Sequence, residues 1–159
     1  MPDNLAAAPL TMCMSKVTLA AGTTTTISNT GTTLYMIKGF MYTKTAMTNV
    51  ATPTVDSARN DAAFRPIVLN QGTVFIVGFD KDGNVKVGQG TIEALDVSGN
   101  FIRKPQNPIL RERVAPVGRI TVKGGATLSG TWTFGSSNLS GVTGVTYTFE
   151  DIGMNLDRP

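Results

Sequence analysis

The stretch VGRITVKGGATLSGTWTFGSSNLSGVTGVTYTF, residues 117–149, decides the fold class of this chain. It consists of short runs of Val, Ile, Thr, Trp, Tyr and Phe, separated by Gly-Gly, Ser-Gly and Gly-Ser-Ser-Asn. β-Branched and aromatic side chains suit a pleated, half-buried surface, and glycine clusters supply the tight turns between strands. The stretch therefore predicts consecutive β-strands.

The middle of the chain extends this pattern. TVFIVGF, residues 73–79, is apolar throughout, which is typical of a strand buried on both faces at the centre of a sandwich. Asp82-Gly83 follows it between two alternating apolar runs and predicts a hairpin. The whole chain predicts an all-β, antiparallel β-sandwich, jelly-roll-like, with about nine or ten strands.

Three further strands are expected before residue 45, and the first is SKVTLA, residues 15–20, in which Val17 and Leu19 alternate with polar residues. TTTTISN, residues 23–29, is polar on both faces apart from its isoleucine, so we expect an edge strand there. TTLYMIKGFMYTK, residues 32–44, reads as one long strand in which Gly39 marks a bulge or bend.

Composition limits the possible functions. The 159 residues predict one domain, residues 15–159, preceded by an extended arm, residues 1–14. There is no histidine and a single cysteine, so we expect no internal disulfide, no metal site and no cofactor. No apolar run is long enough for a membrane helix, and the N-terminus lacks the features of a signal peptide, so we expect synthesis in a host cytoplasm.

Two segments are candidates for contact with the shell or a sister subunit: the arm and a long loop at residues 45–64. A proline-punctuated basic connection at residues 102–116 can cross from one sheet to the other, and two of its arginines are further candidates. Within the loop, Asp56 is expected to cap a helical turn. For the arm, a frayed terminus is an equally good interpretation. For the basic residues, a solvated connector is favoured over phosphate binding. The candidate residues are Leu5, Leu10, Met12, Met14, Met47, Val50, Val55, Arg59, Arg111 and Arg113.

Three patterns with possible chemistry have simpler structural explanations. Trp132/Phe134 and Tyr147/Phe149 form either an exposed sugar-binding face or the core, and the core is favoured because aromatic side chains dominate core burial. Asp80, Asp82 and Asn84 suit a hairpin turn better than a calcium loop. The carboxylates at 93, 96, 150 and 151 show no spacing that marks a catalytic pair, so no catalytic residue is assigned.

Three stretches give the chain a resemblance to structural proteins of tailed bacteriophages. They are TTTTISNTGTTLYMIKGFMYTKTA, PIVLNQGTVFIVGFDKDGNVKVGQGTIEALDVSGNF and GTWTFGSSNLSGVTGVTYTFEDIG, residues 23–46, 66–101 and 130–153. Within that class the chain most resembles the small β-rich decoration, or cement, proteins of phage heads. The resemblance implies a virion protein on the capsid surface that assembles as a dimer or trimer and clamps neighbouring subunits of the major capsid protein. It implies no enzymatic residue, no membrane and no direct nucleic-acid contact.

Two other classes stay open. A receptor- or carbohydrate-binding domain of a tail fibre or spike shares the β content, and it differs by presenting an aromatic face to solvent. A secreted β-sandwich enzyme is disfavoured because the chain has no histidine to act as a base, although paired carboxylates keep this class possible.

Overall fold

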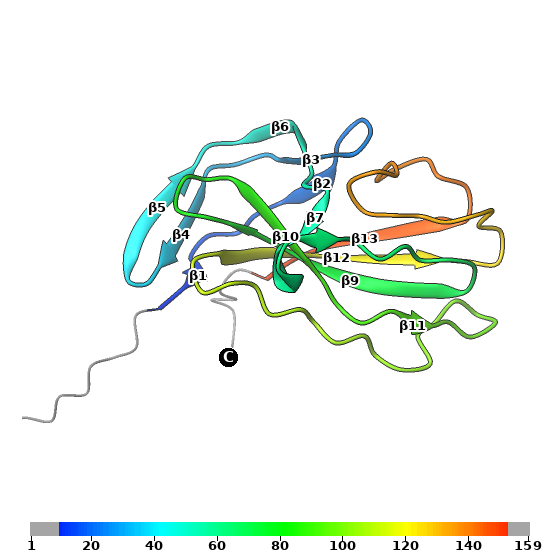
Figure 1. Ribbon diagram of the computed structural model, residues 1–159. Helices are drawn as coiled ribbons and strands as arrows, with labels where there is room; N and C mark the ends of the chain where they lie inside the picture. The colour runs from blue at the N-terminus through cyan, green and yellow to red at the C-terminus, as the bar shows by residue number, and fades with distance from the viewer. Residues whose placement is uncertain (1–9, 153–159) are drawn as a thin grey trace, which may run out of the picture.

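A computed structural model describes residues 10–152, which form an antiparallel β-sandwich (Figure 1) and confirm the predicted fold class. The described residues hold thirteen strands and one short 3-10 helix. The first eight strands are β1 (Met12–Cys13), β2 (Leu19–Ala21), β3 (Thr26–Asn29), β4 (Thr33–Ile37), β5 (Phe40–Lys44), β6 (Met47–Ala51), β7 (Val55–Asp56) and β8 (Ala62–Ala63). The others are β9 (Gln71–Phe79), β10 (Val85–Gln89), β11 (Glu93–Ala94), β12 (Ala115–Gly124) and β13 (Val145–Asp151), and the helix η1 (Ser57–Arg59) follows β7.

One large sheet forms the base of the molecule. Its strand order is β10-β9-β12-β13, and β11 pairs with the beginning of β9. Smaller sheets of order β2-β3-β6 and β1-β4-β5 lie over it, and β7 pairs with β8. Figure 1 shows β2, β3 and β6 above the large sheet and the β4–β5 hairpin at one end of it.

The core lies against the inner face of the large sheet. Phe75 of β9 contacts two aromatic residues from the 125–144 segment, Trp132 at 6.0 Å and Phe134 at 4.5 Å between ring centroids. All three are buried, and the indole N–H donates to the Asn138 carbonyl at 2.9 Å. Tyr147 and Phe149 are partly buried and pack against the same cluster. The aromatic residues therefore form core, as favoured, and present no exposed sugar-binding face.

Strand β9 is central and buried, as its apolar sequence predicts. The outer face of this region is covered by the proline-rich connection, which comes so close at Gly78 and Gly90 that a larger residue does not fit at these two positions. A Cβ atom at Gly90 would lie 2.1 Å from the Gln106 carbonyl oxygen, and one at Gly78 would lie 2.6 Å from a Val114 methyl. The connection therefore runs along the outer face of the large sheet and joins β11 to β12, two strands of that sheet, instead of crossing to the second layer.

Two hairpin turns repeat one sequence pattern, Asp-x-x-Gly-Asn, at residues 80–84 and 96–100. In each, one carboxylate oxygen of the aspartate accepts the backbone N–H groups two and four residues later, at 2.8–3.0 Å. The glycine has a positive φ, 75° in the first turn and 77° in the second, and its N–H donates to the aspartate carbonyl at 3.0 Å. The hairpin predicted at Asp82-Gly83 is confirmed by the pairing of β9 with β10.

Two strand predictions before residue 45 are wrong. Residues 32–44 form the β4–β5 hairpin instead of one strand, because Lys38 and Gly39 both take positive φ, 49° and 85°, and make a two-residue turn. Strand β3 pairs with β2 on one side and β6 on the other, so the threonine-rich segment is central in its sheet and not an edge.

The segments expected to be irregular contain more structure than predicted. Residues 45–64 hold β6, β7, η1 and β8 in place of one long loop. The predicted cap is present: Asp56 precedes η1, and its carboxylate accepts the Ala58 N–H at 2.9 Å. In the arm, residues 12–13 form β1 against β4, and the Cys13 side chain is buried. Residues 1–9 of the predicted arm, Leu5 among them, lie outside the described residues.

Candidate partner-contact surface

The described chain begins beside the β4–β5 turn. Leu10 accepts the Gly39 N–H at 3.0 Å, and the Thr11 hydroxyl accepts the Lys38 N–H at 3.1 Å. Further along, the Met14 N–H donates to the Leu34 carbonyl at 2.8 Å. These bonds lay residues 10–14 along β4 and fix where the chain enters the fold.

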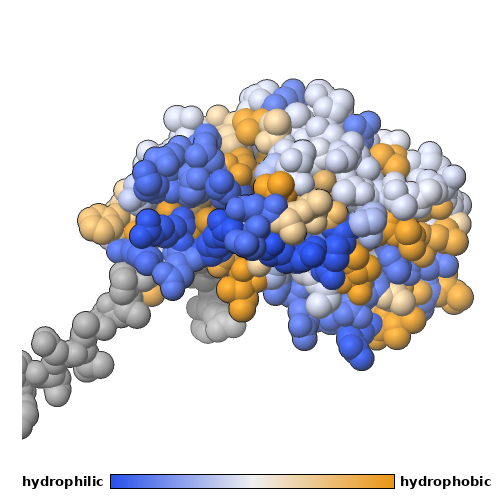
Figure 2. Space-filling model, in the orientation of Figure 1, coloured by the Kyte–Doolittle hydropathy of each residue, from blue (hydrophilic) through white to orange (hydrophobic). Residues whose placement is uncertain are grey.

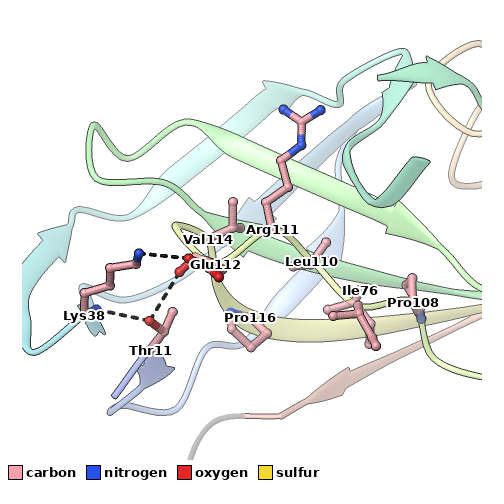
Figure 3. Close-up of a pocket in the computed structure, with 10 residues that line it drawn as sticks. Thr11, Lys38, Ile76, Pro108, Leu110, Arg111, Glu112, Val114 and Pro116 are labelled. Atoms are coloured by element: carbon pink, nitrogen blue, oxygen red, sulfur yellow. Dashed lines mark hydrogen bonds and ion pairs between the residues drawn. The ribbon is translucent and has the colours of Figure 1, made fainter. Parts of the chain in front are cut away.

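A groove of about 610 Å³ lies between this entry strand and the proline-rich connection (Figure 3). We call it the apolar groove, because most of its lining is aliphatic or proline. Figure 3 shows Lys38, Thr11 and Glu112 together at one end of it, with Arg111 apart from them. Ile109 is 89% exposed beside it, so a large apolar side chain meets solvent at this surface. The lining residues are Thr11, Lys38, Ile76, Pro108, Ile109, Leu110, Arg111, Glu112, Val114 and Pro116.

An ion pair joins the connection to the hairpin turn across this groove. Lys38 Nζ lies 2.9 Å from Glu112 Oε2, and the Thr11 hydroxyl donates to the Glu112 carbonyl at 3.4 Å. The hydrogen bond and charge of Lys38 lower the pKa of the Glu112 carboxyl. Both side chains are solvent-accessible, so the pair stabilises the fold little and chiefly orients the groove rim.

A second ion pair fixes the connection to η1. Arg111 donates to the side-chain oxygens of Asn60 at 3.2 Å and Asp61 at 2.9 Å. Both of these residues have left-handed backbone conformations, φ 56° and 59°, immediately after η1. Arg111 therefore contacts a turn whose backbone is unusual for residues other than glycine.

Large apolar side chains are exposed at both ends of the molecule, and Figure 2 shows apolar patches at each end of the visible face. At one end, Ile109 lines the apolar groove, while Leu10 lies on the entry strand and Phe40 and Met41 lie on β5, just after the hairpin turn at Lys38 that also lines the groove. Near the start of β9, on the turn that precedes it and the 96–102 hairpin beside it, they are Val68, Leu69, Val97 and Ile102. Because a nine-residue strand such as β9 spans about 30 Å, the two sets are well separated.

The structure brings some of the sequence candidates together at this surface. Leu10, Met12 and Met14 lie along the entry strand, and Arg111 lines the apolar groove. Arg113 is exposed on the same connection.

Other candidates lie elsewhere. Met47 is buried at 3% exposure, so it is not available to a partner: β6 turns its side chain into the core, and that candidate is wrong. Val50 is half-buried against the core. Val55 and Arg59 are exposed, on β7 and η1.

Sequence reasoning missed Lys38, Glu112 and Ile109 at the groove, and Phe40 and Met41 beside it. Lys38 and Glu112 are 74 positions apart and meet only in the folded chain. The exposed Phe40 and Met41 follow from the hairpin turn at Gly39, which reads as a bulge in sequence. The only local sequence signal for these exposed side chains is the pair of apolar residues directly after Lys38-Gly39.

Three of the four carboxylates considered for catalysis have structural contacts. Asp96 accepts the turn N–H groups described above, Glu150 pairs with Arg119, and Asp151 accepts the Val17 N–H at 2.7 Å. Over residues 10–152, no three His, Cys, Asp or Glu side chains gather as metal ligands. In the same range no helix has the length and apolar character needed to span a bilayer.

Comparison with known protein families, with curated proteins and with solved structures finds no match for this chain. Its functional interpretation therefore depends on the surface just described and on the resemblance in its sequence.

Proposed function

We propose that this protein is a structural virion protein that decorates a bacteriophage capsid and binds across neighbouring major capsid subunits. In this proposal it works on the capsid surface as a dimer or trimer, and the apolar groove with its surrounding side chains contacts the coat. The resemblance of three long sequence stretches to phage structural proteins supports this assignment. The proposal requires a rigid block with adhesive surfaces and no reaction.

The observation that carries the proposal is the exposure of large apolar side chains in the groove and on the entry strand and the β4–β5 hairpin next to it. Phe40 is 70% exposed and Ile109 is 89% exposed, and Leu10 and Met41 are also open to solvent. Exposed apolar clusters rimmed by polar groups are typical of protein contact sites. Full burial of one such side chain contributes about 1.5–3 kcal/mol before the costs of association are subtracted.

The second set of exposed apolar side chains, near the start of β9, favours a bridging role. A molecule that joins two coat subunits needs two separated contact surfaces on one rigid body. The long, buried β9 provides that rigidity, because its backbone hydrogen bonds and core contacts continue from one set to the other.

The alternative is a receptor- or carbohydrate-binding domain of a tail fibre or spike. Its best sequence support was an exposed aromatic face, and the buried Trp132 and Phe134 remove that support. The number of copies per particle separates the classes, since a decoration protein is present in hundreds of copies and a fibre in tens or fewer.

The test measures binding to capsids that lack the protein. The double variant Phe40→Asp/Ile109→Asp places two charges at the groove, and Thr48→Asp, on the exposed side of β6, is the control for added charge. We expect the double variant to lose at least 100-fold in affinity while its thermal midpoint stays near that of the wild type. Unchanged particle binding by a folded double variant would rule out this surface as the coat contact.

A further inference from the structure

A second groove, of about 280 Å³, lies on the outer face of the large sheet. Strands β9, β12 and β13 contribute its floor, and the segment after β11 contributes the opposite wall. We call it the basic groove. Its lining residues are Val74, Phe101, Lys104, Pro105, Arg119, Thr121, Lys123, Thr148 and Glu150.

Two cationic side chains in the basic groove are held in place by the fold. Arg119 donates from Nε to Glu150, its direct neighbour across the β12–β13 pair. Lys123 Nζ donates to the Gly99 carbonyl at 2.8 Å and lies 5.0 Å from the centre of the Phe101 ring. A ligand that binds these cations therefore does not have to immobilise them, which lowers the entropic cost of binding.

Positive charge dominates the lining. Lys104, Arg119 and Lys123 face one carboxylate, Glu150, which leaves a formal surplus of two positive charges. The hydrogen bond from Arg119 lowers the pKa of the Glu150 carboxyl, and the charge of Lys104 contributes in the same direction. The basic groove is therefore complementary to an anion.

The remaining lining limits the kind of anion. Val74, Phe101 and Pro105 give apolar surface, and the Thr121 and Thr148 hydroxyls add hydrogen-bonding groups. The volume lies just under the range of about 300–1,000 Å³ that holds drug-sized ligands, so it suits one side chain. A carboxylate on a short aliphatic stem fits this combination. A phosphate dianion fits less well, because Glu150 repels it more strongly.

We propose that the basic groove binds a carboxylate of a protein partner, an exposed glutamate or aspartate side chain. The proposal rests on the proposed function only in taking the partner to be a protein. Arg119 and Lys123 bind the carboxylate, Lys104 adds long-range attraction, and the apolar lining contacts the aliphatic stem.

The experiment titrates the full-length protein with N-acetylglutamate methylamide and follows backbone amide resonances by NMR. The matched neutral probe is N-acetylglutamine methylamide, which has the same shape without the charge. We expect saturable shifts at residues 104, 119 and 123 with the charged probe, and at least tenfold weaker binding of the neutral one. Equal binding of the two probes overturns the proposal.

Two double variants distinguish binding at the basic groove from a general attraction of the probe by the net positive charge of the protein. Lys104→Met/Lys123→Met removes two groove cations, and Lys16→Met/Lys81→Met removes two exposed lysines that do not line the groove. We expect the first pair to weaken binding at least tenfold and the second pair less than twofold. Equal losses in both pairs overturn the proposal.

Two other ligands are tested as competitors. Glucuronate or inorganic phosphate that binds ten times tighter than the glutamate probe overturns the protein carboxylate in favour of an acidic sugar or a phosphate. These titrations use no capsid. They can therefore give the expected result when the particle-binding test does not, and the particle-binding test can give its expected result when these titrations do not. The two proposals therefore fail independently.

Discussion

Replacement of Gly90 by alanine tests whether the proline-rich connection is held against the large sheet by close backbone packing. A Cβ at this position would lie 2.1 Å from the Gln106 carbonyl oxygen and 2.8 Å from a Val74 methyl. The carbonyl belongs to the backbone, so the clash is not relieved by rotating a side chain. The connection has to move away from the sheet, and the Thr91 N–H then loses its 3.3 Å bond to the same carbonyl.

The expected cost follows from this geometry. Overpacking a well-packed site costs about 1–3 kcal/mol, and the lost backbone bond adds about 0.5–1.5 kcal/mol. We therefore expect Gly90→Ala to lower the free energy of unfolding by about 1.5–4.5 kcal/mol. For a chain of this size that corresponds to a fall in Tm of roughly 3–18 °C.

The assay is urea unfolding followed by tryptophan fluorescence, because Trp132 lies in the core. The denaturation midpoint should fall while the slope stays constant, as expected when stability changes without a change in the unfolded state. Gly31→Ala is the matched control, since its Cβ would meet no atom within 4 Å and its φ is not positive. A Gly90→Ala midpoint equal to that of Gly31→Ala would refute the reasoning.

Three further predictions concern the core, the turns and the groove rim. Trp132→Ala should cost about 3–5 kcal/mol in unfolding free energy, because it leaves a cavity beside Phe75; a loss under 1 kcal/mol by calorimetry would contradict the assigned core. Backbone hydrogen bonds, first that of Asn100, lower the pKa of Asp96, so its contribution is present above the unfolded pKa of about 4 and is lost as pH falls through the lower folded value. Asp96→Asn should therefore flatten the acid side of a stability–pH curve, and an unchanged acid side speaks against this role. Lys38→Met should change the unfolding free energy by less than about 1 kcal/mol and raise the pKa of Glu112 measured by NMR; a Glu112 pKa that does not move would contradict the ion pair.

The parts of the fold that the sequence predicted are those governed by local chemistry. The apolar run of β9, the Asp82-Gly83 hairpin and the cap at Asp56 each depend on residues within a few positions of one another. The aromatic core was also favoured correctly, because few arrangements of a sandwich leave a tryptophan and a phenylalanine two residues apart in solvent.

The errors arise where a backbone conformation is unusual for its residue. Lys38 adopts a positive φ that lysine rarely takes, so its hairpin turn was read as a bulge within one strand. Asn49 also adopts a positive φ, inside β6. This interrupts the alternation of buried and exposed residues that would have marked a strand.

Most of the candidate surface depends on contacts that have no local signature. Lys38 meets Glu112 only because the connection returns along the sheet to the β4–β5 turn. The basic groove likewise combines Phe101 and Lys104 with residues of β12 and β13. The sequence predicts Arg111 and Arg113 of the connection as contact residues. The grooves beside the connection depend on Gly78 and Gly90, where the missing side chain lets the connection approach the large sheet.

The two Asp-x-x-Gly-Asn turns have a practical use. Each is closed by backbone N–H groups that donate to the side chain and carbonyl of its aspartate, so the turn bonds do not use the side chains of the two residues between the aspartate and the glycine. In the second turn these are Val97 and Ser98, and both are exposed. Replacement of Ser98 by cysteine would therefore attach a fluorophore through an exposed side chain while the backbone bonds of the turn, and the Gly99 carbonyl that accepts from Lys123, are kept.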